Sequence, residues 1–381
     1  MVYFDNSATT RPYSEVVEAF SSVSLTYFAN PSSLHSLGKE SEQLLTHARK
    51  NIASLLNVNS KEVYFTSGGT EGNNLALKGT ARQLQSRGKH IITTKIEHSS
   101  SYETLTELEK EGFSVTYLPT DNHGKVDVEE IKNQLRDDTI LVSIIHVSNE
   151  LGTIQPVEDI GKLLLKYPKV VFHVDHVQGV TKVPLNFHDA GIDLCTLSAH
   201  KFHGLKGTGV LYVREGVNVS ALFSGGQQER GVRPGTENLA GIVSMTKALR
   251  LALIESSKKI ELMRELNKSI EKQLLEIPGV NVNSPSNRAP HILNVSTPYL
   301  KPEVIVQALA EKGIFVSTKS ACSSKQFEPS RILQASGFSD ENASSSIRIS
   351  LSFDNTSEEA DFFVKSFKKI VFNMKKVVKI K

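Results

Sequence analysis

The sequence has only two cysteines, Cys195 and Cys322, so a framework of disulfides is excluded. No apolar run reaches the roughly 18 residues that a membrane-spanning helix needs. The first residues, MVYFDNSATT, lack the basic and apolar regions of a secretory signal. We therefore expect a cytoplasmic protein with both thiols free. No cysteines and histidines have the spacing of a zinc site, and the net charge of +3 does not indicate nucleic-acid binding.

The overall composition is that of an ordinary folded protein, with 39% hydrophobic and 22% charged residues. At 381 residues the chain is long enough for two domains. Between residues 60 and 215, short β-branched runs alternate with amphipathic segments, which predicts an α/β domain with a mostly parallel, covered sheet. The expected strands are 63–67, 90–94, 114–118, 139–145, 170–175, 193–198 and 209–213, and the expected helices lie near 70–86, 99–111, 127–136 and 156–166.

The pattern changes near residue 236, where a long helical stretch begins that continues to about residue 275. A smaller α+β domain is expected after it. Its expected strands are 292–297, 314–317 and 347–351, and its expected helices lie near 302–312, 328–336 and 356–376. The polar segment STKSACSS (317–324) is expected to be a loop, so Cys322 is expected to be accessible, whereas Cys195 lies in a strand that we expect to be buried.

One lysine directly follows a predicted buried strand, in the string Ser198-Ala199-His200-Lys201. Open parallel sheets bind ligands at the carboxyl ends of their strands, and a partly desolvated lysine amine can form a Schiff base with an aldehyde cofactor. Ser198 and His200 could donate hydrogen bonds to a phosphate. The alternative reading of so short a string is a plain surface lysine.

Asp175 ends another predicted strand, with one strand between it and Lys201, and Gln178 follows it closely. A carboxylate at this position could pair with a protonated pyridine nitrogen and so keep a pyridoxal cofactor able to accept electrons. Both groups could then reach one pocket. Alone, an aspartate at a strand end is more often a helix cap or a turn residue.

The string FTSGGTEGNN (65–74) places two glycines between a strand and a helix that begins near Thr70. The free N–H groups of such a helix start make a phosphate site, and Gly69 lets the backbone approach the anion. The string is neither a Walker A motif nor a dinucleotide fingerprint. An ordinary strand-to-helix turn is the alternative.

Four further residues are weak candidates when each is taken alone. His98 could stack on a flat ring or move protons. Asn149 and Arg348 could hold a substrate carboxylate, the arginine through two parallel hydrogen bonds. Cys322 could act as a nucleophile, although it could equally be an incidental surface cysteine.

Taken together and in order, these strings resemble the cysteine desulfurases of the NifS/IscS type, and the resemblance covers nearly the whole chain. The strings that carry it are YFDNSATT (3–10), NPSSLHSLG (30–38), FTSGGTEGNNLALKG (65–79), HIITTKIEH (90–98), DDTILVSIIHVSNELGTIQP (137–156), HVDHVQ (173–178), SAHKFHGLKGTGVLYV (198–213), GGQQERGVRPGTEN (225–238), ILNVS (292–296), SACSS (320–324) and SSIRISL (345–351).

The resemblance implies the type I fold of pyridoxal-phosphate (PLP) enzymes and a homodimer. It implies a large domain at 13–255 and a small domain made of 1–12 and 256–381. Lys201 would hold PLP covalently, and Cys322 would take sulfur from L-cysteine as a persulfide and pass it to an acceptor protein. The other implied roles are the pyridine nitrogen for Asp175, the ring hydroxyl for Gln178, ring stacking and proton transfer for His98, the phosphate for Gly69, Thr70, Ser198, His200 and the partner subunit's Thr236, and the substrate carboxylate for Asn149 and Arg348.

Some positions depart from the family's pattern. Lys319 replaces the usual glycine of the cysteine loop, His176 stands where a small residue is common, and Arg233-Pro234 stands where Arg-Ser is frequent. The basic C-terminal tail is short. These departures favour a dedicated acceptor, such as a tRNA-thiolating enzyme, over a general iron–sulfur scaffold.

Three other functions stay open at this stage. A selenocysteine lyase or cysteine-sulfinate desulfinase of the same fold would not strictly need the loop thiol. An aminotransferase would form a keto acid from a second substrate. A catalytically idle docking protein would need neither Lys201 nor Asp175 nor Cys322, and the presence of all three argues against it.

Overall fold

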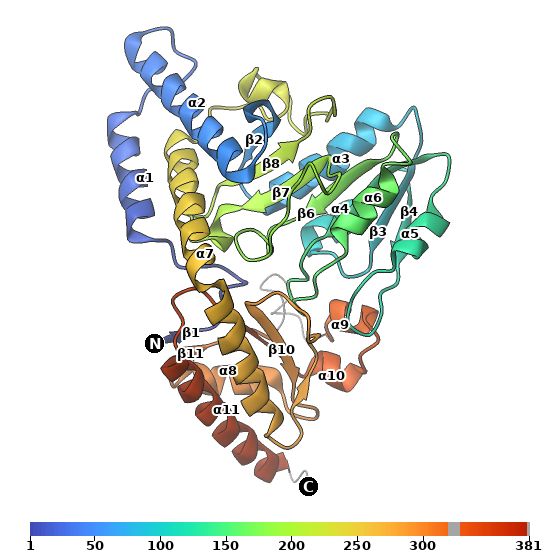
Figure 1. Ribbon diagram of the computed structural model, residues 1–381, viewed down its shortest axis with the longest axis vertical. Helices are drawn as coiled ribbons and strands as arrows, with labels where there is room; N and C mark the ends of the chain where they lie inside the picture. Colours follow the sequence, from blue (N-terminus) through green and yellow to red (C-terminus); the bar gives the residue numbers. More distant parts are fainter. Residues whose placement is uncertain (319–327, 379–381) are drawn as a thin grey trace.

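A seven-stranded sheet forms the centre of the larger part of the computed structural model, which describes residues 1–318 and 328–378 (Figure 1). The strands lie in the order β2-β8-β7-β6-β5-β3-β4. Their bounds are β2 Val63–Thr66, β3 His90–Thr94, β4 Ser114–Leu118, β5 Thr139–Ile145, β6 Val171–Asp175, β7 Leu194–Ser198 and β8 Gly209–Val213. Strand β8 runs antiparallel to both of its neighbours, β2 and β7, and the other neighbouring pairs of this sheet are parallel. The predicted fold class is therefore confirmed.

Helices cover both faces of this sheet because its strands are apolar on both faces. Neighbouring residues of a strand point to opposite faces, and Leu141 and Val142 of β5 accordingly belong to two different hydrophobic clusters. The cluster of Leu141 includes side chains of α3 (Gly69–Leu84) and α4 (Ser99–Lys110). The cluster of Val142 includes side chains of α2 (Ser36–Leu56), α6 (Val157–Leu164) and α7 (Leu239–Leu275).

Helix α7 connects the larger part of the molecule to the smaller one (Figure 1). Its first half packs in the same cluster as Val142, whereas Met263, Ile270 and Leu274 pack in a second core. The second core lies around a three-stranded antiparallel sheet of order β12-β10-β9. Its elements are β9 Asn281–Val282, β10 Ile292–Ser296, α8 Pro302–Ala310, β11 Ile314–Phe315, α9 Arg331–Ala335, α10 Asp340–Ser344, β12 Ser346–Ser350 and α11 Ser357–Val378.

The N-terminal residues belong to this smaller part of the molecule. Strand β1 (Val2–Tyr3) pairs in parallel with β11, and Phe4 is buried in the second core. Two separate cores agree with two domains, while the boundaries 13–255 and 256–381 stay predictions.

The structure also contains elements that the sequence analysis did not predict. Helix α1 (Ser14–Thr26) and helix α2 precede the first predicted strand, and α2 buries an apolar stripe that includes Leu45, Ala48 and Ile52. The predicted helix at 328–336 is shorter, because the Ser330 side chain caps it by accepting from the Leu333 N–H. Within the described residues, no helix is long and apolar enough to cross a membrane.

Candidate active site

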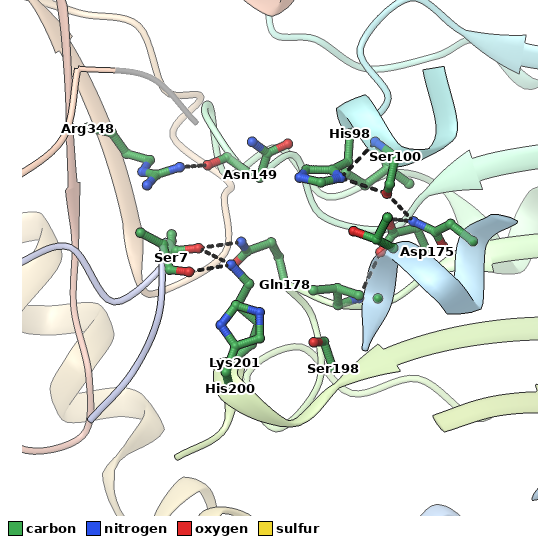
Figure 2. Close-up of a pocket in the computed structure, with 16 residues that line it drawn as sticks. Ser7, His98, Ser100, Asn149, Asp175, Gln178, Ser198, His200, Lys201 and Arg348 are labelled. Carbon is green, nitrogen blue, oxygen red and sulfur yellow. Dashed lines mark hydrogen bonds between the residues drawn. The ribbon is translucent and has the colours of Figure 1, made fainter. Parts of the chain in front are cut away.

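The carboxyl ends of the parallel strands open into a cavity of about 700 Å³, a volume that includes its solvent-filled mouth (Figure 2). This edge of an open sheet is where such folds bind ligands. The predicted site residues other than Cys322 and Thr236 all line it. The lining residues are Ser7, Ala8, Gly69, Thr70, Asn73, His98, Ser100, Ile145, Asn149, Asp175, Val177, Gln178, Ser198, His200, Lys201 and Arg348.

Lys201 ends a short 3₁₀ turn that directly follows β7. Its Nζ donates to the Ser7 carbonyl at 2.6 Å and to the Ala8 carbonyl at 2.8 Å (Figure 2). Gln178 donates to the same Ser7 carbonyl at 2.9 Å. The N-terminal segment therefore forms one wall of the cavity, and it brings acceptors to the amine from the far end of the sequence.

Asp175 is the last residue of β6, and it is only 3% exposed. Its Oδ2 accepts from Asn73 Nδ2 at 2.7 Å, and its Oδ1 accepts from the Val177 N–H at 3.0 Å. Each carboxylate oxygen has more than one lone pair. This carboxylate can therefore still accept from a protonated ring nitrogen in the cavity.

The start of α3 has the features of an anion site. Gly68 has a φ of 152°, in a region that favours glycine, and α3 begins at Gly69, so its first N–H groups lack partners within the helix. A Cβ at Gly69 would lie 3.0 Å from Val177 Cγ2, so a side chain there would crowd the turn. Burial, followed by the nearby Lys201, lowers the pKa of His200 to about 3, which keeps this imidazole neutral.

His98 caps helix α4 at the rim of the cavity. Its Nδ1 lies 2.8 Å from Ser100 Oγ and accepts from the Ser100 N–H at 3.2 Å. Burial lowers the pKa of His98, the charge of Asp175 opposes this change, and Lys201 adds to it. The ring is therefore a neutral group whose orientation is fixed by the helix cap.

Arg348 lies in β12 of the smaller part of the molecule, and it reaches the cavity from there. Its Nη1 donates to the Asn149 carbonyl at 2.8 Å, and its Nη2 forms an ion pair with Asp5 Oδ1 at 3.0 Å. Arg348 Nε and Asn149 Oδ1 are buried with no hydrogen-bond partner among the described residues. The guanidinium is thus already held on one side, and Nε remains for a ligand.

Two predicted residues are not found in this cavity. Thr236 lies exposed in the segment before α7 and does not line the cavity, so its predicted contribution from a partner subunit stays a prediction. Cys322 lies outside the described residues, as does Lys319. Cys195 is buried, as predicted.

The sequence analysis assigned no role to Ser7, Asn73 or Ser100, which all line the cavity. The string YFDNSATT contains Ser7, and its position at the N-terminus gave no reason to place it beside Lys201.

Across residues 1–318 and 328–378, no group of three or more histidines, cysteines, aspartates and glutamates could hold a metal ion.

Comparisons with known proteins match this geometry. The family described as "Aminotransferase class-V" matches residues 2–363. The chain belongs to the class-V aminotransferase family. Within this family it is 44% identical over 380 residues to the "NifS/IcsS protein homolog" of Lactobacillus delbrueckii subsp. bulgaricus, covering 99% of each chain. It is also 44% identical to the "Cysteine desulfurase IscS" of Dictyoglomus turgidum, covering 99% of this chain and 96% of that protein.

Comparisons with solved structures lead to the same conclusion. A structure named "NIFS-LIKE PROTEIN" has a TM-score of 0.92 at 38% identity, covering 97% of this chain and 99% of that one. The apo structure of a cysteine desulfurase from Thermococcus onnurineus NA1 has a TM-score of 0.87 at 26% identity, covering 98% of this chain and 95% of that one. The resemblance to NifS/IscS-type proteins is confirmed.

Class-V aminotransferases of this type depend on PLP, and the cavity of this member fits that group. It offers an amine on Lys201, a carboxylate on Asp175 and a helix start at Gly69 for a phosphate. It also contains buried polar atoms without partners among the described residues, namely Ser7 Oγ, Asn149 Oδ1, His200 Nδ1 and Arg348 Nε. Because buried polar atoms are rarely left unpaired, these atoms indicate a polar ligand.

Proposed function

We propose that this protein is a PLP-dependent cysteine desulfurase, which removes sulfur from L-cysteine, leaves L-alanine and carries the sulfur on Cys322. The observation that supports this most strongly is the meeting of Lys201, Asp175 and Arg348 around one cavity, although they come from the turn after β7, from β6 and from β12. An amine, a carboxylate and a guanidinium at one site suit an amino-acid substrate bound beside PLP. The names of the relatives agree with this function.

When bound, PLP supplies a place for the electrons that the α-carbon of the substrate releases. Asp175 would accept a hydrogen bond from the pyridine nitrogen and hold it protonated, with Asn73 fixing the carboxylate. Lys201 Nζ would hold PLP at rest and then take the α-proton of cysteine. The start of α3, Ser198 and His200 would bind the phosphate.

The remaining predicted residues would bind and orient the substrate. Arg348 Nε and Asn149 Nδ2 would donate to its carboxylate. Arg348 Nε is a buried donor that lacks a partner among the described residues. His98 would lie against the PLP ring and exchange protons as a neutral base. Gln178 would bind the ring hydroxyl.

The proposal includes an assembly and a destination for the sulfur. We infer a cytoplasmic homodimer in which the partner subunit's Thr236 completes the phosphate site. The acceptor would be a tRNA-thiolating enzyme or an iron–sulfur scaffold, and the departure at Lys319 favours the former. Transfer of sulfur-35 from the loaded enzyme to purified candidates tests this choice, and faster transfer to a scaffold would reverse it.

The test of the function itself is cysteine-dependent formation of sulfide and alanine, with added PLP and a reductant, in the wild type and in Cys322→Ala. We expect equal amounts of the two products from the wild type and a loss of sulfide release in the variant. Full activity in Cys322→Ala would instead indicate a selenocysteine lyase or a cysteine-sulfinate desulfinase.

A further inference from the structure

A second lysine, Lys182, lies buried behind Lys201. It is 5% exposed, and its Nζ donates to the main-chain carbonyl of Lys201 at 2.8 Å. It belongs to the turn that follows Asp175 at the end of β6. One hydrogen bond therefore joins the segment that carries Asp175 to the segment that carries Lys201.

The main chain around Lys201 obtains its hydrogen bonds from distant parts of the sequence. The His200 carbonyl accepts from the Thr10 N–H at 2.8 Å and from Thr10 Oγ1 at 3.0 Å. The Lys201 carbonyl accepts from Lys182. Because a buried carbonyl without a donor is costly, Thr10 and Lys182 together fix the turn from which the Lys201 side chain extends into the cavity.

The surroundings of Lys182 contain cationic and neutral groups. The titratable groups that act on it or that it acts on are Lys201, His176, His203 and His291. Within residues 1–318 and 328–378, no carboxylate forms an ion pair with its amine. Burial, followed by the charge of Lys201, lowers the pKa of Lys182 to about 7.

We propose that Lys182 is a positioning residue for Lys201: its buried amine donates to the Lys201 carbonyl and so holds the turn from which the Lys201 side chain extends. A lysine amine can donate this hydrogen bond in its charged and in its neutral form. The support therefore does not depend on a charge on Lys182, whose pKa of about 7 leaves it partly neutral near pH 7. This inference rests on the proposed role of Lys201 as the residue that holds PLP.

The first test uses the apoprotein, so it requires neither cysteine nor turnover. Competitive acylation followed by peptide mass spectrometry gives the rate at which Lys201 reacts. In Lys182→Met, which leaves the Lys201 carbonyl without its donor, we expect this rate to change by about threefold or more, whereas Lys182→Gln, which keeps a donor, should stay close to the wild type. The exposed Lys132→Met on α5 (Val128–Gln134) should leave this rate unchanged.

The second test measures the effect of this positioning in the holoenzyme. Lys182→Met leaves the Lys201 carbonyl without its donor, so we expect kcat to fall about 10- to 100-fold with little change in KM, together with altered visible circular dichroism of bound PLP. Lys182→Gln keeps a donor and should stay within about threefold of the wild-type kcat with an unchanged dichroism.

Each outcome decides for or against the role of Lys182. A wild-type labelling rate in Lys182→Met, or a wild-type kcat and dichroism in that variant, would overturn the proposal. If Lys182→Met does not fold, Lys182→Ala takes its place in both measurements. A changed labelling rate in a protein that makes no sulfide would support the role of Lys182 and contradict only the proposed desulfurase function.

Discussion

The imidazole rings of His146 and His176 face each other inside the core, with their Nδ1 atoms 2.7 Å apart. Burial lowers the pKa of His146 to about 4, and it lowers the pKa of His176 well below its ordinary value. Both rings are therefore neutral at pH 7, and one Nδ1 donates to the other. The main-chain N–H of His146 also donates to the main-chain carbonyl of Asp175 at 2.9 Å. The histidine pair is therefore joined to the residue whose carboxylate we propose to bind PLP.

Gly179 leaves the space that this pair occupies. A Cβ at residue 179 would lie 2.5 Å from His176 Nδ1 and 2.8 Å from His146 Nδ1. We expect Gly179→Ala to lower the free energy of unfolding by about 1–3 kcal/mol through overpacking. In a His176→Ala background, the added cost of Gly179→Ala should shrink. Urea unfolding of the wild type, the two single variants and the double variant measures this coupling. Strictly additive losses of unfolding free energy would contradict the claim that Gly179 leaves space for His176.

Glu97 is a buried carboxyl whose Oε1 accepts from Thr94 Oγ1 at 2.7 Å and from the Ile145 N–H at 3.0 Å. Burial, reinforced by the charge of Asp175, raises its pKa from 4.5 to about 8. The folded apoprotein therefore binds a proton here that the unfolded chain has released, and the stabilisation is lost as the pH rises from about 4.5 through 8.

Glu97→Gln should remove this pH dependence, because the amide does not titrate. We expect the variant to gain stability relative to the wild type between pH 5 and pH 8, as measured by urea unfolding of the apoproteins. The exposed Glu129→Gln should follow the wild type. Parallel curves for Glu97→Gln and the wild type would show that Glu97 is ionised in the folded protein.

Arg348 is 1% exposed, and its free Nε lies in the cavity lining. Replacing it with lysine keeps the charge but removes Nε, so we expect KM for L-cysteine to rise about 10-fold or more, with a smaller change in kcat. Steady-state kinetics measures both values. The partly exposed Arg264→Lys on α7 is the control, and an unchanged KM in Arg348→Lys would assign the substrate carboxylate to other groups.

Lys319 lies three residues before Cys322 in the sequence, outside the described residues. A nearby cation favours a thiolate, so we expect Lys319→Gly to raise the pH at which Cys322 is alkylated. Iodoacetamide labelling across a pH series measures this change. An identical profile in the variant would show that Lys319 does not act on the thiol.

The larger sheet could be predicted from the sequence alone, because each strand is a local apolar run. All seven expected strands of this sheet are present, and the strand ends place Asp175 and Lys201 at one edge. The helices α1 and α2 were missed although α2 carries a buried apolar stripe. The short strand β1 gives too weak a local signal, because only its pairing with β11 makes it a strand.

The sequence by itself determined the positions of the buried strands along the chain, the string that carries Lys201 and the family to which these strings belong. All of these are encoded in neighbouring residues. Only the tertiary structure decided that the Ser7 carbonyl meets Lys201, that Asn73 holds Asp175, and that Lys182 supports the Lys201 turn. These contacts join segments far apart in the chain, and no local pattern specifies them, because they arise only when the two cores fold around α7 and bring the N-terminus to the edge of the sheet.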